Sequence, residues 1–136
     1  MAKHGAFQGY IQVNGVDLSD HCTEFDAPLN IADLQGNAMG DTDEYGMPGL
    51  NQGDVTATFL QDFAAASVHR TLRPLHNNHT THPLVWRASS AAAAVANPEY
   101  SGDYYVQNYR PIGGAHGAQT FATVTFRRAG NLTNTA

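Results

Sequence analysis

A strand that runs almost directly into a helix, within residues 48–75, constrains the fold more than any other part of the sequence. Residues 55–60 alternate between two faces, as in a half-buried strand, with Val55, Ala57 and Phe59 on the same side. After Asp62, which suits a helix N-cap, apolar residues recur at helical spacing and predict a core-facing helix: Ala65, Val68, Leu72 and Leu75. The segment positions no nucleophile and no phosphate group, and we interpret it as scaffold.

The pair Asn14-Gly15 predicts a β-hairpin with a two-residue type I′ turn. With that turn, Val13 lies opposite Val16 and Ile11 lies opposite Leu18, so these apolar side chains share one face. A slip of one residue would turn that face to the solvent. The register and the apolar pattern therefore agree with each other.

Residues 31–51 follow neither the strand pattern nor the helix pattern. A segment of about twenty residues without periodicity is uncommon in a compact domain, where it is usually functional or disordered. Its apolar side chains argue against disorder, because disordered segments are depleted of them. We therefore expect an extended loop that packs on another molecule. The candidate contact residues are acidic or apolar: Asp33, Met39, Asp41, Asp43, Glu44, Tyr45, Met47 and Leu50.

Further strands are expected at residues 22–29, 84–87, 104–109 and 119–127, with turn-forming residues at 97–102. We expect the helix to lose its register near Pro74, because proline disfavours helical geometry in the residue before it. The sequence does not decide whether residues 89–96 form a helical turn or a loop. Together these elements predict a mainly β (α+β) fold. It is an antiparallel two-sheet sandwich or barrel with one flanking α-helix and a long loop, in a single domain of residues 1–136.

The chain is poor in charge for its size, since 14% of its 136 residues are charged where soluble domains average about 25%. Small and amide residues take their place, and such a surface loses little hydration when it is buried against neighbours. A β-rich monomer with a neutral surface is the alternative interpretation. The net charge of −5 and the absence of a basic run argue against tight, sequence-specific binding of nucleic acid.

The single cysteine, Cys22, leaves no intrachain disulfide possible, and a buried thiol is its expected state. Neither the apolar core of a signal peptide nor a stretch of membrane-spanning length is visible. We expect a protein that is made in a reducing interior and is used there or is assembled there into a particle.

Four histidines lie within fourteen residues, at positions 69, 76, 79 and 82, a spacing at which zinc ligands can converge. However, His79 and His82 lie in a turn-forming stretch with no cysteine or carboxylate nearby. We therefore predict exposed or interface histidines and no metal site. A small hydrolase that uses this region is kept as a lesser alternative.

Other chemical motifs are incomplete. Residues 41–46 have the acidic density of a calcium loop, but Tyr45 stands where an EF-hand needs its third ligand. The glycine-rich residues 113–117 have neither a lysine nor a following helix, so we do not expect a phosphate site. We assign no catalytic residue, metal ligand or cofactor, and we expect that the protein is not an enzyme.

Four segments carry a resemblance to a known family and follow the family's order over most of residues 10–130: VNGVDLSDHCTEFDAPL, PGLNQGDVTATFLQDFAAASVHRTLRPL, NPEYSG and QTFATVTFRRAG. The chain resembles the major tail (tail tube) proteins of bacteriophages with long, non-contractile tails. That resemblance implies a structural virion protein whose subunits, each with two packed sheets, close into a hexameric ring. The rings would stack into a tube whose lumen, lined by strands from all subunits, conducts DNA.

The resemblance also implies partners and a location. The subunit would bind copies of itself and other tail proteins such as the tape measure and terminator, with DNA only in transient passage and no membrane. It would be made in the host cytoplasm and act in the virion tail, where residues 31–51 would contact other subunits or rings.

We expect a polar, acidic lumen to which DNA does not adhere, with Arg70, Arg73 and Arg87 at interfaces or on the outer surface. A tail terminator, a neck protein or a decoration protein is the alternative assignment. A tube protein similar to that of type VI secretion is a further one.

Overall fold

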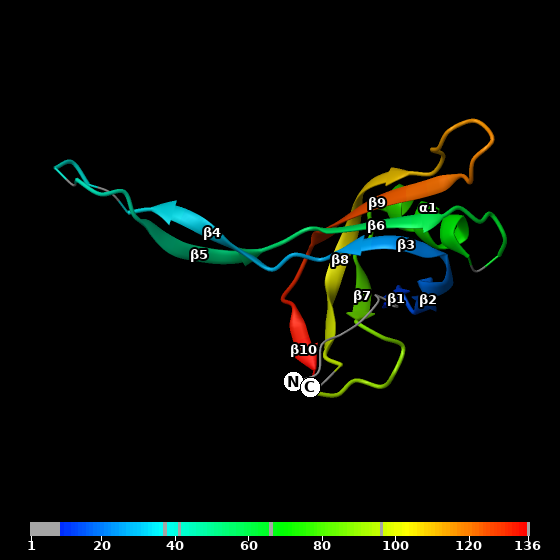
Figure 1. Ribbon diagram of the computed structural model, residues 1–136, viewed down its shortest axis with the longest axis horizontal. Helices are drawn as coiled ribbons and strands as arrows, with labels where there is room; N and C mark the ends of the chain where they lie inside the picture. The colour runs from blue at the N-terminus through cyan, green and yellow to red at the C-terminus, as the bar shows by residue number, and fades with distance from the viewer. Residues whose placement is uncertain (1–8, 37, 41, 66, 96, 136) are drawn as a thin grey trace.

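The computed structural model describes residues 9–36, 38–40, 42–65, 67–95 and 97–135 of the chain. It confirms the predicted fold class, because antiparallel strands dominate it and the described residues contain one α-helix (Figure 1). A 3₁₀ turn at Ser19–His21 follows the first hairpin. The other elements, in chain order, are β1 (Tyr10–Val13), β2 (Val16–Asp17), β3 (Cys22–Asp26), β4 (Asn30–Gln35), β5 (Gly46–Gln52), β6 (Val55–Leu60), α1 (Val68–Asn78), β7 (His82–Arg87), β8 (Glu99–Arg110), β9 (Phe121–Arg128) and β10 (Thr133–Thr135).

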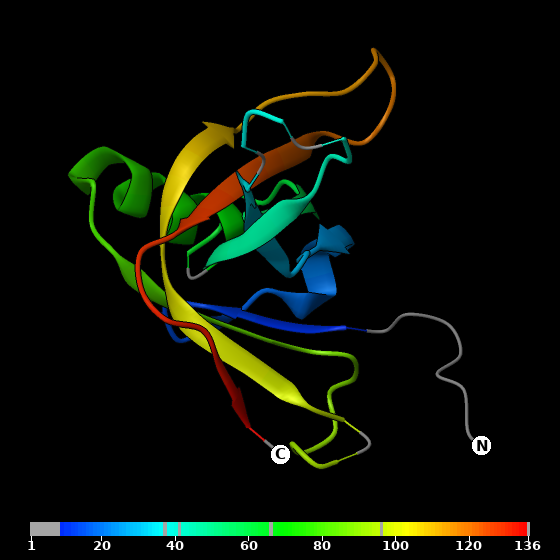
Figure 2. The same ribbon diagram turned by 90° about the vertical axis from the view of Figure 1, so that its left-hand side faces the viewer.

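The main sheet has the strand order β2-β1-β7-β8-β9-β6-β3, with β10 added to β8. The long strand β8 belongs to both halves of this sheet, since residues 99–104 pair with β7 and residues 104–110 pair with β9. Figure 2 shows β8 curving from one half to the other. The halves face each other across the core, where the rings of Phe25 in β3 and Trp86 in β7 are 5.8 Å apart. The two layers of the predicted sandwich are thus halves of one curled sheet.

The core is built from the alternating side chains of paired strands. β6 and β9 bury alternate residues in register: Val55 with Phe126, Ala57 with Val124, and Phe59 with Ala122. α1 adds Val68, Leu72 and Leu75 to the same cluster and packs on β8. The predicted alternation of residues 55–60 is therefore confirmed.

The helix begins later than the sequence predicted, and one expected core residue lies outside it. α1 starts at Val68, whereas Ala65 is an exposed residue of the preceding turn. The reason is Asp62, whose Oδ1 accepts the backbone N–H of Ala64 at 2.9 Å and whose Oδ2 accepts the Ser67 hydroxyl at 2.9 Å. Such local bonds to the backbone compete with helix formation. Asp62 thus anchors the approach to the helix without capping it.

The helix does not lose its register near Pro74, contrary to the prediction. α1 continues to Asn78 and ends at His79, whose φ of 55° is left-handed. A proline inside a helix costs about 3 kcal/mol, because it removes one backbone hydrogen bond and crowds the preceding turn. Leu72 and Leu75, on either side of Pro74, are buried, and their packing offsets this cost.

The first hairpin is confirmed in both turn and register. Asn14 and Gly15 have φ values of 49° and 82°, as a type I′ turn requires. Val13 pairs with Val16, and the backbone N–H of Leu18 donates to the carbonyl of Ile11 at 3.1 Å. Ile11, Val13 and Leu18 are all at most 1% exposed, so the shared apolar face is part of the core.

The predicted turn at residues 97–102 is largely strand, because β8 already begins at Glu99. Gly102 suggested a turn, but its role is close packing. A Cβ there would lie 3.3 Å from the carbonyl oxygen of Asn131 and 3.3 Å from a ring carbon of Tyr104. This close approach brings β10, which the sequence did not predict, alongside the start of β8.

The described residues of the segment 30–52 form a β-hairpin arm rather than the predicted aperiodic loop. Within the described residues, β4 and β5 pair antiparallel as a separate two-stranded sheet, and this sheet projects from the body (Figure 1). A register shift between Ile31 and Asp33 breaks the alternation, and Pro48 and Gly49 hide the strand character of β5 in the sequence. These irregularities explain why no periodicity was visible.

The arm joins the body through two short connections, residues 27–29 and residues 53–54, which belong to no strand. β3 leads through the first into β4, and β5 leads through the second into β6. Gly53 passes so close to the carbonyl oxygen of Pro28 that no Cβ would fit between them. The two connections therefore lie against each other at the base of the arm.

Replacing Leu72 with alanine should lower the free energy of unfolding by about 2–5 kcal/mol, because it leaves a cavity in a well-packed core. Leu72 lies on α1, is 0% exposed and belongs to the core cluster that the helix shares with the sheet. Asn77→Ala, at an exposed position of the same helix, should change the stability by less than about 0.5 kcal/mol. Urea unfolding followed by circular dichroism measures both values, and similar stabilities for the two variants would contradict the core assignment.

Candidate assembly surfaces

The residues predicted to contact other subunits lie on the arm, and those that the structure describes expose much of their surface. Met39 at the tip is 105% exposed and Leu50 near the base is 84% exposed. Tyr45 and Met47 are about half exposed, while Asp33, Asp43 and Glu44 are exposed acids. Asp41 lies outside the described residues. On the described part of the arm and at its base, three further exposed apolar residues were not named from the sequence: Leu29, Ile31 and Leu34.

The exposed apolar residues of the arm are grouped rather than scattered. Leu34 and Met47 are direct partners in register, and Leu34 lies over the bare backbone of Gly49. At the base, Leu29, Ile31 and Leu50 line an open groove together with Leu132 of the body, and Arg128 borders it. Grouped apolar exposure of this kind marks interaction surfaces. Register in β4–β5 was the missing information that would have placed Ile31 and Leu34 with the others.

A second candidate surface is the open face of β3, β6, β9 and β8, the face turned away from the core. Side chains that pair across these four strands form two polar rows: Glu24–Thr58–Thr123–Arg110 and Asp26–Thr56–Thr125–Asn108. Arg127 lies beside Tyr105 on the same face. Hydroxyl groups therefore form the middle of this face, with acids on β3 and cations on β8 and β9.

A polar network holds the approach to α1. The carboxylate of Asp62 binds the Ser67 hydroxyl and lies 3.2 Å from Nε2 of His21. The backbone N–H of Ala64, followed by the Ser67 hydroxyl, lowers the pKa of Asp62 below its ordinary value. Both Ser67 and His21 contact the carboxylate rather than each other. This arrangement ties the 3₁₀ turn at Ser19–His21 to the approach to α1 and does not activate a serine nucleophile.

The four histidines of residues 69–82 do not converge. Nδ1 of His69 lies 3.0 Å from the hydroxyl of Tyr109, and the ring of His69 packs 4.9 Å from that of Phe63. His82 is 2% exposed, with its ring edge-on to Phe126 at 5.5 Å. The prediction of exposed or interface histidines is therefore wrong for His82, because β7 starts at this residue and turns it inward with Leu84. No three His, Cys, Asp or Glu side chains gather as metal ligands in the part of the chain that the structure describes.

Cys22 is a half-buried residue at the start of β3. Burial raises the pKa of its thiol to about 11. The thiol also donates a hydrogen bond to the carbonyl of Glu24 at 3.4 Å. A thiol that stays protonated at neutral pH is a poor nucleophile. Cys22 therefore serves packing rather than chemistry.

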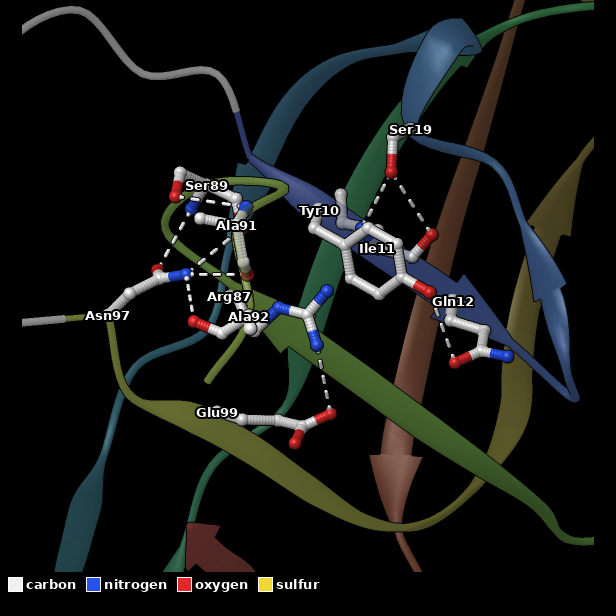
Figure 3. Close-up of polar contacts among 10 residues, drawn as sticks. All are labelled: Tyr10, Ile11, Gln12, Ser19, Arg87, Ser89, Ala91, Ala92, Asn97 and Glu99. Carbon is white, nitrogen blue, oxygen red and sulfur yellow. Dashed lines mark hydrogen bonds and ion pairs between the residues drawn. The ribbon is translucent and has the colours of Figure 1, made fainter. Parts of the chain in front are cut away.

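Arg87 makes its contacts within its own chain, which corrects the expectation that it lies at an interface or on the outer surface. Its guanidinium lies 3.4 Å from the carboxylate of Glu99 and 4.1 Å from the ring centroid of Tyr10 (Figure 3). Its side chain is only 15% exposed. By contrast, Arg70 and Arg73 are exposed on α1.

Asn97 organises the described part of the neighbouring loop, residues 88–95. Its amide donates to the carbonyls of Ser89, Ala91 and Ala92, and its Oδ1 accepts the backbone N–H of Ser89 at 3.2 Å (Figure 3). Asn97 is buried, yet the loop leaves Val95 90% exposed. The sequence left helix and loop open for residues 89–96, and the described part of this segment is a loop.

Within the described residues, no helix has the length and apolarity needed to cross a membrane. No protein-family model matches the chain, and no curated protein matches it. The similarity to known proteins lies in three-dimensional structure.

A chain from the virion of a native gene transfer agent particle is similar with a TM-score of 0.74 and 11% identity, covering 99% of this chain and 100% of that chain. A chain from the tail of the empty particle, which has C6 symmetry, has a TM-score of 0.70 and 11% identity, covering 99% of this chain and 100% of that chain. The SPP1 tail tube has a TM-score of 0.72 and 7% identity, covering 95% of this chain and 76% of that chain. A sheath/tube terminator of an extracellular contractile injection system has a TM-score of 0.72 and 7% identity, covering 100% of this chain and 99% of that chain.

At these identities the likeness establishes the fold. The chain has a tail-tube-like fold, and the match extends over nearly its whole length, arm included. The similar structures are structural parts of particles, and none is described as an enzyme.

The buried His82 should make the protein less stable in mild acid. Burial lowers its pKa below the ordinary value of 6.5, although the carbonyl of Pro83 and the charge of Asp103 oppose the shift. The unfolded chain therefore binds the proton more readily, so stability is lost as the pH falls through the unfolded value toward the folded one. His82→Phe should reduce the drop in melting temperature between about pH 7.5 and about pH 5.5, whereas His116→Phe in an exposed loop should not. An unchanged drop in His82→Phe would show that other groups cause it.

Proposed function

We propose that this chain is the subunit of a tail tube in a phage or a related particle. Six copies close into a ring, and the rings stack into a tube that conducts DNA. The protein acts as a single domain with an arm, uses no cofactor and resides in the virion tail. The observation that carries the proposal is the arm, an ordered apolar β-hairpin that stands away from its own body in a chain with a tail-tube-like fold.

The arm gains most of its stability from a partner under this proposal. A two-stranded hairpin alone is marginally stable in water. β4 and β5 pair with each other and expose large apolar side chains on both sides of the arm's base. Burying one such side chain completely is worth about 1.5–3 kcal/mol. Several of them packed on a neighbouring subunit would fix the arm and join the copies.

Six-fold symmetry is supported by the tail of the gene transfer agent particle, which has C6 symmetry and a similar chain. The sheet itself favours ring closure. β3 ends the strand order of the main sheet, so its outer edge has no partner strand within the described residues. An exposed edge promotes association with another strand, and a closed ring removes it.

The open face of β3, β6, β9 and β8 is the best candidate for the lumen. Its central rows are threonines, whose short hydroxyl side chains offer DNA no cation. Arg110 and Arg127 on this face are balanced by Glu24 and Asp26, so the lumen proposed here is neutral and rich in hydroxyl groups, whereas the sequence alone predicts an acidic one. A neutral wall neutralises no phosphates and releases few counterions, so DNA would slide rather than bind.

A tube terminator is the second candidate, because the injection-system terminator matches this fold over nearly the full length of both chains. A terminator ring closes one end of a tube and does not polymerise. Size-exclusion chromatography and negative-stain imaging of the purified chain separate the candidates. Stacked rings with a central channel support a tube subunit, single rings favour a terminator, and small monomers at all concentrations would refute both.

Charge on the arm's apolar surface should block assembly without unfolding the subunit. Leu50→Asp places a carboxylate at a position that is 84% exposed in the monomer and buried in the proposed contact. The critical concentration for tube formation should rise by at least about tenfold, while the melting temperature stays within about 2 °C of the wild type. Gln52→Asp, an exposed position of the same strand, is the matched control. Normal tubes from Leu50→Asp would remove the arm from the assembly contact.

Positive charge on the open face should make the tube retain DNA. Thr56→Lys and Thr125→Lys, at paired positions, would add two cations per subunit to the proposed lumen. Assembled tubes of this double variant should retard short duplex DNA in a salt-sensitive manner, whereas wild-type tubes should not. Asn77→Lys with Asn78→Lys, at two exposed positions near the end of α1, also adds two cations per subunit and is the control for net charge. Equal retention by control and double variant would place the open face outside the channel.

A further inference from the structure

We infer that the exposed face of α1 receives the arm tip of a second copy of this chain. The inference deepens the proposed assembly and rests on it, since it names the surface on which the arm docks. The receiving surface, called the helix face below, consists of Phe63, Arg70 and Arg73. The inserted surface, called the arm tip below, consists of Met39, Asp43 and Glu44.

The helix face is basic and carries an exposed aromatic ring. α1 turns Val68, Leu72 and Leu75 into the core, which leaves Arg70 and Arg73 outside and one turn apart. The helix contains no acidic residue. Neither arginine takes part in the ion pairs of the described residues, which are His21–Asp62 and Arg87–Glu99.

Phe63 extends this basic surface with apolar area. Its side chain is 52% exposed, and its ring packs at 4.9 Å on that of His69, which lies next to Arg70 in the helix. Exposed aromatic and arginine side chains are the composition that protein interfaces favour. The described structure holds this ring in place without covering it.

The arm tip has the complementary composition. Asp43 and Glu44 are exposed, and residues 30–52 contain no lysine, arginine or histidine that could neutralise them. Met39 is completely exposed at 105% and can adapt its shape to an aromatic partner. One apolar side chain and two acids thus match one aromatic ring and two cations.

The arm tip and the helix face cannot meet within one copy of the chain. The arm and α1 lie at opposite ends of the long axis of the molecule (Figure 1). The arm tip of one copy therefore meets the helix face of another, in a head-to-tail contact that leaves each copy with one used and one open site. Such a heterologous contact generates closed rings or stacked filaments rather than pairs.

The other cations of the described residues are less suited to the arm tip. Arg110 and Arg127 lie on the open face, where Glu24 and Asp26 balance them. Arg87 is paired with Glu99, and Arg128 borders the groove at the arm's own base. The helix face combines two exposed cations with an apolar side chain, and the acid next to Phe63, Asp62, is already bound to Ser67 and His21.

Charge reversal on each side tests the pairing. Asp43→Arg with Glu44→Arg, and separately Arg70→Glu with Arg73→Glu, should each raise the critical concentration for tube formation by about tenfold or more, because like charges then meet. Combining all four substitutions in one chain should return it to within about threefold of the wild type, because opposite charges meet again. Asp20→Arg with Asp54→Arg, at exposed positions outside both surfaces, changes the net charge by the same four units as the arm-tip variant and controls for it.

The outcomes separate this inference from the proposed function. Tubes that form normally in both reversed variants, or a folded four-residue variant that is not rescued, would overturn the docking while leaving the tube assignment intact. If wild-type subunits instead bind duplex DNA and the helix-face variant loses only that binding, the docking is likewise overturned and the helix face is a nucleic-acid surface. Circular dichroism confirms that each variant is folded.

Disulfide trapping tests the same contact without relying on tubes. Met39→Cys and Phe63→Cys in one chain, with Cys22→Ser as background, should give a ladder of covalent multimers on oxidation. Either new cysteine alone should give dimers at most. A ladder without visible tubes would support the docking and refute the tube, whereas no ladder from assembled tubes would refute the docking.

Discussion

The backbone hydrogen bonds of β8 hold both halves of the main sheet to one strand, and the positions of the other elements follow from this pairing. β7 and β10 flank its first half, and β9 pairs with its second half. A register shift between Val106 and Asn108 lies within the second half, and an extra residue of this kind strengthens the local twist of a strand. The twist turns the two halves toward each other, so that Tyr104, Val106 and Tyr109 all reach one core on which α1 packs.

Elements with a strict local pattern could be predicted from the sequence. The hairpin at Asn14-Gly15 depends on two residues with positive φ, and the strands β6 and β9 depend on alternate burial. Elements whose pattern is altered by contacts elsewhere could not. Asp62 looked like a helix cap until its bonds to Ala64 and Ser67 were visible, and Gly102 looked like a turn until its contact with Asn131 was known. Neither contact has a signature in a single sequence.

The candidate surfaces show the same division. The composition of residues 31–51 was enough to predict an exposed, apolar and acidic segment, but its pairing as β4 and β5 needed the register between Leu34 and Met47. The charge of the open face could not be foreseen, because it depends on which strand lies next to which. Glu24 and Arg110 are eighty-six positions apart in the chain yet belong to one row across the sheet. Threonines paired across β6 and β9 lie between them, and no local pattern relates these positions to each other.

The two connections at the base of the arm have a mechanical consequence for any filament built from such subunits. Residues 27–29 and 53–54 belong to no strand of either sheet, so these two short connections alone carry the chain between the arm and the body. When a filament curves, the spacing between successive layers lengthens on its convex side and shortens on its concave side. In such a filament, each arm could follow that change by a small rotation about these connections, while its tip stays bound to the neighbouring subunit. Curvature would then be accommodated at the connections, and the wall of the channel would stay continuous along the bend.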